Sequence, residues 1–349
     1  MRTAWTWASV AVLGTLGMFA PLYLPAFYLR LLTESLIYAM FAMSIDLLAG
    51  YAGLVTLGHA GIFGISAYLV GYLTARLGLP MHVTFPCGVL GAVGASLLFG
   101  IMAVRTSGVY FLLITMAQGM IVWGLAFRWT SVTGSENGIR GILRPDALAT
   151  QQAYYYVILG AFVLVAFLLV RLVRSPFGLS LLGLRENEAR LRALGYSVWL
   201  HRLLAFLVSG CFAGIAGAFY AFHNNFVSPD AVHFVLSGQG LLMVILGGAG
   251  TLVGPVVGAG VFIFLRNVVS LYTDRWPMVL GALFVLTVLL APQGLVGLAR
   301  QLLRRWPAGA EPAPVGSTLP YGVVSPQPLD GRNNPAPHQP TNHPGKRRR

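Results

Sequence analysis

The sequence has little charge of either sign. Only 9% of its 349 residues are Asp, Glu, Lys or Arg, whereas about a quarter of the residues are charged in a typical soluble domain. Lysine is almost absent, since Lys346 stands alone beside 22 arginines, and we attribute this imbalance to codon usage rather than to chemistry. A water-soluble globular domain of this length is therefore excluded.

Cysteine is equally scarce, and a nucleotide-binding loop is missing. Cys87 and Cys211 lie far apart in apolar surroundings and indicate neither a disulfide framework nor a metal site. No G-x-x-x-x-G-K-[ST] motif occurs. We therefore expect no cofactor bound by this chain, and any ATP must be used by a partner subunit. The net charge of +13 does not predict nucleic-acid binding, because the arginines stand at the ends of apolar segments.

Long apolar segments dominate what is present. Hydrophobic residues make up 56% of the chain, and the mean hydropathy is +0.74. Because a spanning helix needs about 20 mostly apolar residues, these segments predict an all-α integral membrane protein, a polytopic bundle of about ten transmembrane helices. The predicted spans lie near residues 6–24, 30–49, 54–75, 83–103, 109–128, 154–172, 203–223, 238–250, 252–272 and 277–296.

Two of these segments admit a second interpretation. Segment 6–24 follows Arg2, as a signal peptide would, but Pro21 and Pro25 come without a small-residue cleavage site, which favours a retained span. Segment 238–250 is short and is joined to the next by glycines, so it either spans the membrane or is re-entrant.

Basic residues predict the orientation. With ten spans and an inner N-terminus, 16 of the 23 basic residues fall on the inner side and 7 on the outer side. Loops rich in Lys and Arg stay in the cytoplasm. The charged segment 174–202, which interrupts the apolar segments with five arginines, is therefore predicted to be cytoplasmic.

The charged segment 174–202 predicts a short amphipathic helix beneath the membrane. Ser175 and Pro176 suit a helix start, and Gly195 suits a left-handed stop. The four-residue spacing of helical ion pairs occurs in Glu186–Arg190 and Glu188–Arg192. One apolar face is expected from Leu184, Leu191 and Leu194. Such a helix either lies on the membrane without a partner or docks a soluble subunit.

Composition separates a C-terminal tail from the rest of the chain. Residues 307–349 are rich in Pro, Gly, Asn and His and have too few apolar residues to fold alone. We expect a transmembrane domain over residues 1–306 and a disordered, Pro-rich, basic cytoplasmic tail over residues 307–349. Its basic end, residues 346–349, is suited to contact with anionic lipid.

Glycines mark two helix contacts. Gly58, Gly61 and Gly64 share one predicted helix face, where they permit either close packing or sliding between helices. A second cluster predicts a break between the eighth and ninth spans, which forms either a hairpin or a stretch of backbone that lines a polar path. Its residues are Gly247, Gly248, Gly250, Gly254 and Pro255.

Two ionisable residues fall inside predicted spans. His59 is either a packing or capping residue or a functional one, and nothing near it offers a metal-ligand set. Asp46 stands one turn before Gly50, and we expect it to cap the backbone of residues 50–53 rather than to act in transport. All other charges are placed near span ends, so we expect no buried ion pair.

Residues 133–141 predict a flexible polar loop on the outer side. The loop is either an ordinary turn or a contact for a protein that delivers substrate. The candidate contact residues are Thr133, Gly134, Glu136, Asn137 and Gly138.

Several of these motifs resemble one known family. Arg185-Glu186-Asn187-Glu188-Ala189, followed by Ala193-Leu194-Gly195, resembles the cytoplasmic coupling loop of ABC-importer permeases, in particular the branched-chain amino acid permeases of the LivM type. Arg190 and Leu191 depart from the general importer pattern, so the resemblance is to the narrower family. Further ordered matches cover roughly residues 35–298 and lie at residues 50–68, 133–139, 204–220, 246–259 and 292–295.

The resemblance implies an assembly and a cargo. It implies a permease domain over residues 1–306 whose coupling loop contacts an ATPase through Arg185, Glu186, Asn187, Glu188, Ala189, Arg192 and Gly195. The partners would be two ATP-binding-cassette ATPases, a second permease of the LivH type and an extracytoplasmic substrate-binding protein, in the bacterial cytoplasmic (inner) membrane. The implied cargo is leucine, isoleucine or valine; urea, amides and other amino acids are alternatives.

Two other classes of function fit the sequence less well. An intramembrane serine protease would use Ser209 and His223, but no G-x-S-x-G motif and no orienting acid accompany them. An ion-coupled secondary transporter would need charged residues near the membrane midplane.

Overall fold

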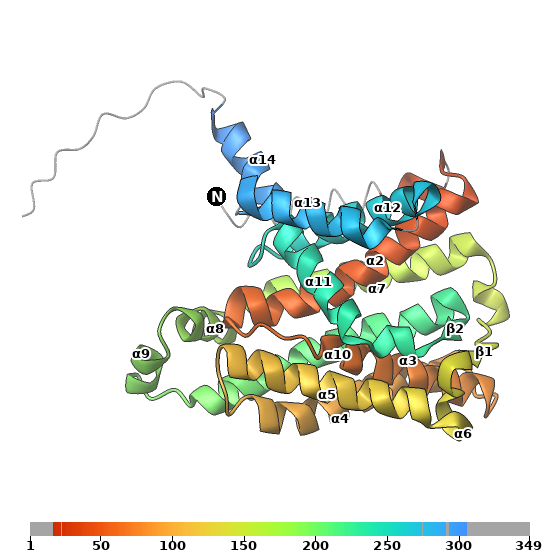
Figure 1. Cartoon of the computed structure of the whole chain (residues 1–349), viewed down its shortest axis with the longest axis horizontal. Coiled ribbons are helices and arrows are strands. Elements are labelled where there is room, and N and C mark those ends of the chain that lie inside the picture. The colour runs from red at the N-terminus through yellow and green to blue at the C-terminus, as the bar shows by residue number, and fades with distance from the viewer. Residues whose placement is uncertain (1–16, 22, 274, 291–292, 306–349) are drawn as a thin grey trace, which may run out of the picture. The chain divides into compact units, whose positions relative to one another are not determined.

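Helices make up nearly all of the chain that the structure describes. The computed structural model describes residues 17–21, 23–273, 275–290 and 293–305 (Figure 1). Its α-helices are α2 (Ala26–Asp46), α3 (His59–Ala75), α4 (Met81–Ala103), α5 (Val109–Arg128), α6 (Thr130–Thr133), α7 (Gln151–Val173), α8 (Pro176–Glu186), α9 (Glu188–Ala193), α10 (Val198–Asn224), α11 (Phe234–Gly247), α12 (Val253–Tyr272), α13 (Trp276–Leu290) and α14 (Gly294–Arg305). The shorter elements are the π-helix η1 (Leu47–Ala52), the 3₁₀ turns η2 (Ser135–Asn137), η3 (Asp146–Leu148) and η4 (Pro229–Val232), and the strands β1 (Ile139–Arg140) and β2 (Phe226–Val227).

The long helices correspond to predicted membrane spans. Among the described residues, six helices are long and apolar enough to cross a membrane: α2 with η1, α4, α5, α7, α10 and α12. Three shorter apolar helices, α3, α11 and most of α13, match the remaining predicted spans after the first. Most of the first predicted span, residues 6–24, and the predicted tail, residues 307–349, lie outside the described residues. The prediction of a helical membrane protein is confirmed, and the number ten stays a prediction.

One predicted helix boundary is wrong, and one helix is not predicted. α3 begins at His59 rather than near residue 54, because the chain leaves η1 at Gly53 in a left-handed conformation (φ 71°) and stays non-helical through Gly58. Gly58 therefore precedes the helix face that carries Gly61 and Gly64. The sequence analysis also does not predict α14. This helix is amphipathic and begins at the end of the last predicted span.

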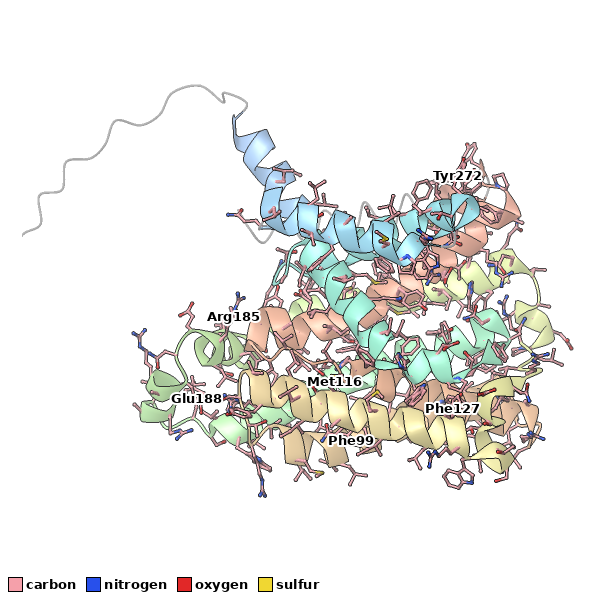
Figure 2. The ribbon with its side chains drawn as sticks, in the orientation of Figure 1. Phe99, Met116, Phe127, Arg185, Glu188 and Tyr272 are labelled. Carbon is pink, nitrogen blue, oxygen red and sulfur yellow. The ribbon has the colours of Figure 1, made fainter. Side chains whose placement is uncertain are left out.

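Successive helices bring their loops to two ends of the bundle. Figure 1 shows α8 and α9 at one end and the strands β1 and β2 at the other, and Figure 2 labels Arg185 and Glu188 at the former end and Phe127 and Tyr272 near the latter. We call these the charged end and the sheet end. The loops predicted to be cytoplasmic share the charged end, and the assignment of that end to the cytoplasm rests on the positive charge.

The centre of the bundle is α10, which packs between α3 and α4 through small residues. Ser66 donates a hydrogen bond to the carbonyl of Gly214 (2.7 Å), and a methyl group at Gly217 would overlap the carbonyl of Phe63. In a membrane, close helix contact depends on van der Waals packing rather than on hydrophobic transfer, so small residues at the contact stabilise it.

α11 is short and follows a 3₁₀ turn. After β2, the turn η4 lies against α3, where Val232 fills the space beside Gly64, and Ser237 accepts a hydrogen bond from Ala60 N (2.8 Å). α11 has 14 residues, or about 21 Å at 1.5 Å per residue, which is shorter than the hydrocarbon core. The choice between a crossing and a re-entrant segment for residues 238–250 stays a prediction.

Gly64 tests this packing. We expect Gly64→Ala to destabilise the protein by about 1–3 kcal/mol through overpacking, because the added methyl group overlaps Val232 of η4. Gly94→Ala is the matched control, since no atom lies within 4 Å of a Cβ at that position of α4, and Ala is the better helix former. Thermal unfolding in nanodiscs checks both variants; equal melting temperatures would contradict the close contact.

Candidate functional site

The charged segment forms two helices rather than the single helix that the sequence predicts. α8 begins as expected, with Pro176 in its first turn and the Ser175 side chain accepting a hydrogen bond from Gly178 N (3.4 Å). The chain then leaves helical geometry at Asn187, whose side-chain oxygen accepts a hydrogen bond from Arg190 N (2.9 Å) and caps α9. Asparagine favours a cap over a helix interior, because its side chain competes for backbone donors.

α9 ends at the predicted glycine. Gly195 adopts a left-handed conformation (φ 86°), and its N–H donates to the carbonyl of Arg192 (3.0 Å). The N–H of Tyr196 donates to the carbonyl of Leu191 (3.3 Å), which completes a Schellman motif. The stop predicted from the sequence is confirmed.

Glu188 joins α9 to the bundle. Its carboxylate pairs with Arg192 (2.7 Å), as the four-residue spacing predicts, and with Arg202 of α10 (2.7 Å). The Arg202 side chain is 11% exposed, against 70% for Arg192, so the pair with Arg202 is the better shielded of the two. The spacing of charged residues in the sequence does not predict the pair of Glu188 with Arg202. The predicted pair of Glu186 with Arg190 does not form in the described structure, because Asn187 separates their helices.

The tip of the charged segment exposes apolar residues. Leu184 and Leu191 are buried together with Val198, but Leu194 is 70% exposed, contrary to the predicted apolar face, because α9 ends before that residue. Tyr196 follows it and is 46% exposed. An apolar tip that is flanked by exposed Arg190 and Arg192 is typical of a surface that a partner covers.

α8 is tied to the bundle by Arg185. Its guanidinium donates a hydrogen bond to the carbonyl of Gly50 at the end of η1, and its stem lies against Gly53. Gly250, in the loop between α11 and α12, approaches the same guanidinium. Arg185 therefore contacts two of the regions that the sequence singled out separately.

Asp46 binds the loop between α11 and α12. Its fully buried carboxylate accepts hydrogen bonds from Gly250 N (2.6 Å) and from Leu252 N (3.2 Å). The expectation that Asp46 caps residues 50–53 is wrong, because its carboxylate oxygens accept hydrogen bonds from a loop about 200 residues later in the sequence. Hydrogen bonds to a charged acceptor are the stronger kind, and these lie where water does not compete.

The glycines around this loop form a hairpin. A methyl group at Gly247 would overlap the carbonyl of Gly254, and Gly248 lies against the carbonyl of Gln293, next to the start of α14. Pro255 stands in the first turn of α12, where it removes no helical hydrogen bond. Since Asp46 and the Thr251 hydroxyl take the free N–H groups of Gly250, Leu252 and Gly254, this geometry is that of a hairpin rather than of a backbone-lined path. We call Asp46, Gly50, Arg185 and residues 247–254 the junction.

His59 and Ser209 lie together in the core, away from the junction. His59 Nε2 is 2.8 Å from Ser209 Oγ, and the Ser209 hydroxyl is also 2.5 Å from the carbonyl of Ser44. The protease alternative paired Ser209 with His223, and that pairing is wrong. Both His59 and Ser209 have no exposed surface, so no substrate reaches them.

Residues 133–141 lie at the sheet end, where they form the 3₁₀ turn η2 and the strand β1. Thr133 is buried and donates to carbonyls at the end of α5, Gly134 and Gly138 have positive φ, and Ile139 pairs with Val227 of β2. Glu136 and Asn137 are exposed beside this small sheet. The structure therefore does not bring these residues together with the junction, and the flexibility of the loop stays a prediction.

One charged pair lies within the spans, contrary to expectation. Arg266 of α12 and Glu34 of α2 form an ion pair of 2.5 Å. Glu34 lies further inside than predicted because α2 begins at Ala26, about four residues before the predicted start, whereas α12 ends at Tyr272 as predicted and Arg266 was wrongly counted as near that end.

Comparisons with known proteins agree on one family. The model of the family described as "Branched-chain amino acid transport system / permease component" matches residues 27–289. The high-affinity branched-chain amino acid transport system permease protein LivM of Escherichia coli (strain K12) is 30% identical over 299 residues, which cover 78% of this chain and 70% of that protein.

A second relative is named for a different cargo. The autoinducer 2 import system permease protein LsrC of Escherichia coli O157:H7 is 28% identical over 278 residues, or 71% of this chain and 75% of that protein. The membrane-spanning helices and these matches together show that the chain belongs to the branched-chain amino acid transport permease family and is a permease subunit of an ABC transporter.

Proposed function

We propose that this chain is one half of the membrane channel of an ATP-driven importer for leucine, isoleucine and valine. A second, LivH-type permease would complete the channel, and two ATPase subunits would dock at the charged end. A substrate-binding protein would deliver cargo at the sheet end, where Glu136 and Asn137 are exposed. The proposed location is the bacterial cytoplasmic (inner) membrane, with the charged end in the cytoplasm.

The observation that carries this proposal is the tip of α9. Leu194 and Tyr196 are exposed beside the exposed Arg190 and Arg192 at the charged end. Arginine and aromatic side chains are enriched at protein interfaces, and a docked ATPase would remove the apolar surface from water. The coupling role of Arg185, Glu186, Asn187, Glu188, Ala189, Arg192 and Gly195 is part of the proposal.

The junction supports a route by which docking moves the spans. A displacement of α9 reaches α10 through Glu188 and Arg202, and a displacement of α8 reaches η1 through Arg185 and Gly50. Asp46 then connects α2 to the loop between α11 and α12. We infer that ATP binding in the partner subunits shifts this connected set and so reorients the two permease halves in alternating access.

The cargo is the finer part of the proposal. The name of the LivM relative favours branched-chain amino acids, while the LsrC relative imports autoinducer 2. Urea, amides and other amino acids remain alternatives, because the binding protein selects the cargo before it reaches this chain.

Transport by the reconstituted importer tests the function. We expect proteoliposomes that contain this chain, its partner permease and the ATPases to accumulate labelled leucine when ATP and the binding protein are present, and to take up urea far more slowly. Uptake without ATP would contradict an ATP-driven mechanism. Faster uptake of urea would reassign the cargo within the family.

Glu188 and Gly195 test docking. We expect Glu188→Ala to lower leucine-stimulated ATP hydrolysis and uptake about tenfold, because α9 loses its tie to Arg202. Gly195→Ala is expected to act in the same direction, since its φ of 86° strains a side chain. Asp146→Ala is the matched control, because Asp146 is exposed, lies outside the charged segment and makes no ion pair in the described structure. Equal activity of Glu188→Ala and Asp146→Ala would show that α9 is not the docking element.

Arg185 tests the route through the junction. We expect Arg185→Ala to keep the ATPase bound yet to slow uptake more than ATP hydrolysis, since the link from α8 to Gly50 is lost. Arg190→Ala, on the exposed side of α9, would instead weaken ATPase binding. Co-purification and the ratio of uptake to hydrolysis separate the two effects. A parallel loss of both activities in Arg185→Ala, with weaker ATPase binding, would contradict the route.

A further inference from the structure

The ion pair between Glu34 and Arg266 lies inside the spanning part of the bundle. Glu34 stands eight residues after the start of α2, or about 12 Å along the helix, and Arg266 stands six residues before the end of α12, or about 9 Å. Both distances run inward from the sheet end. Ionisable residues at such depth are costly, and they commonly mark paths for substrates or ions.

The pair of Glu34 with Arg266 is partly buried. The Glu34 side chain is 18% exposed and the Arg266 side chain 22% exposed, while most of α2 beyond residue 37 is fully buried. A pair that served only to hold α2 against α12 could be replaced by apolar side chains with little loss of stability, because the desolvation of two charges offsets their attraction. Stability alone therefore gives a weak account of these two residues.

Aromatic side chains surround the pair. The guanidinium carbon of Arg266 lies 5.7 Å from the ring centroid of Tyr38, and the rings of Tyr38 and Tyr220 meet edge to face at 6.2 Å. Tyr220 also lies 5.2 Å from Phe63, centroid to centroid. Ring faces attract ammonium groups as they attract guanidinium groups, so this surface suits a cation as well as an apolar side chain.

The 3₁₀ turn η4 lies near the same aromatic group. Val232 of η4 lies beside Gly64 of α3, the residue that follows Phe63. The Tyr68 hydroxyl, also on α3, is buried and has no hydrogen-bond partner among the residues that the structure describes. A buried donor without a partner is costly, and it is available to a polar ligand.

We propose that Glu34 and Arg266, with Tyr38 and Tyr220, form a transient binding site for a zwitterionic α-amino acid on its way through the permease. The ligand exchanges the internal ion pair for two external ones: its carboxylate pairs with Arg266, and its ammonium group pairs with Glu34 and lies against the tyrosine rings. Two new ion pairs replace one, but the ligand loses the hydration of both its charges and the internal pair is broken, so the site holds cargo weakly and releases it readily. This inference rests on the proposed import of amino acids and specifies the charge pattern of the cargo.

Charge-selective binding tests the site. The complete importer in nanodiscs, without ATP and without the binding protein, is titrated with leucine, with 4-methylpentanoate, which lacks the ammonium group, and with leucinamide, which lacks the carboxylate. We expect Glu34→Gln to weaken binding of leucine and leucinamide by about tenfold and to leave 4-methylpentanoate unchanged. Arg266→Gln is expected to weaken binding of leucine and 4-methylpentanoate and to leave leucinamide unchanged.

Two further variants keep the test decisive. Arg266→Lys retains the charge if Arg266→Gln fails to fold, and we expect it to retain binding of 4-methylpentanoate. Asp146→Asn, which removes an exposed acid of η3 outside the site, is the control and is expected to bind all three compounds normally. Normal binding in both charge-removing variants, or an equal loss for all three compounds, would overturn the site. If the unsubstituted importer takes up leucine while either of those results holds, only the site is wrong; if it takes up no leucine with ATP, the proposed function itself is wrong.

Discussion

The hydrogen bonds that Asp46 accepts from Gly250 and Leu252 are the contact on which the rest of the arrangement depends. They join the end of α2 to the hairpin between α11 and α12, two parts of the chain that are remote in sequence. A buried carboxylate without these donors would carry a large desolvation penalty, and the free N–H groups of the hairpin would be left without partners. Asp46 and the hairpin therefore stabilise each other. Arg185 connects the charged segment to the same junction through the carbonyl of Gly50.

This junction gives the charged end a mechanical role. Glycines let the backbones of η1, the hairpin and the start of α14 meet closely, so a displacement of η1 passes directly from backbone to backbone. At the other end of α2 and α12, Glu34 pairs with Arg266. The same two helices thus connect the surface where we propose that ATPases dock to the place where we propose that cargo passes.

The sequence predicted most of the fold and only parts of the site. Apolar length predicted the spans, and Ser175, Pro176 and Gly195 predicted both ends of the charged segment, because caps act locally. The predicted single helix places Asn187 in its interior, although this side chain favours capping, and so it wrongly pairs Glu186 with Arg190; Leu194 is exposed because α9 ends before it. The partners of Asp46, Arg202 and Arg266 depend on which helices pack together, and no pattern of spacing in a single sequence contains that information.

Cross-linking at the tip of α9 tests the central claim most directly. The importer with Leu194→Cys, in a background without Cys87 and Cys211, is treated with a short thiol cross-linker and its products are identified by mass spectrometry. The account predicts a cross-link from residue 194 to the ATPase subunit whose yield changes when ATP is bound. A complex that hydrolyses ATP and transports leucine, yet never cross-links from this position, would contradict the claim that work enters the permease through α9.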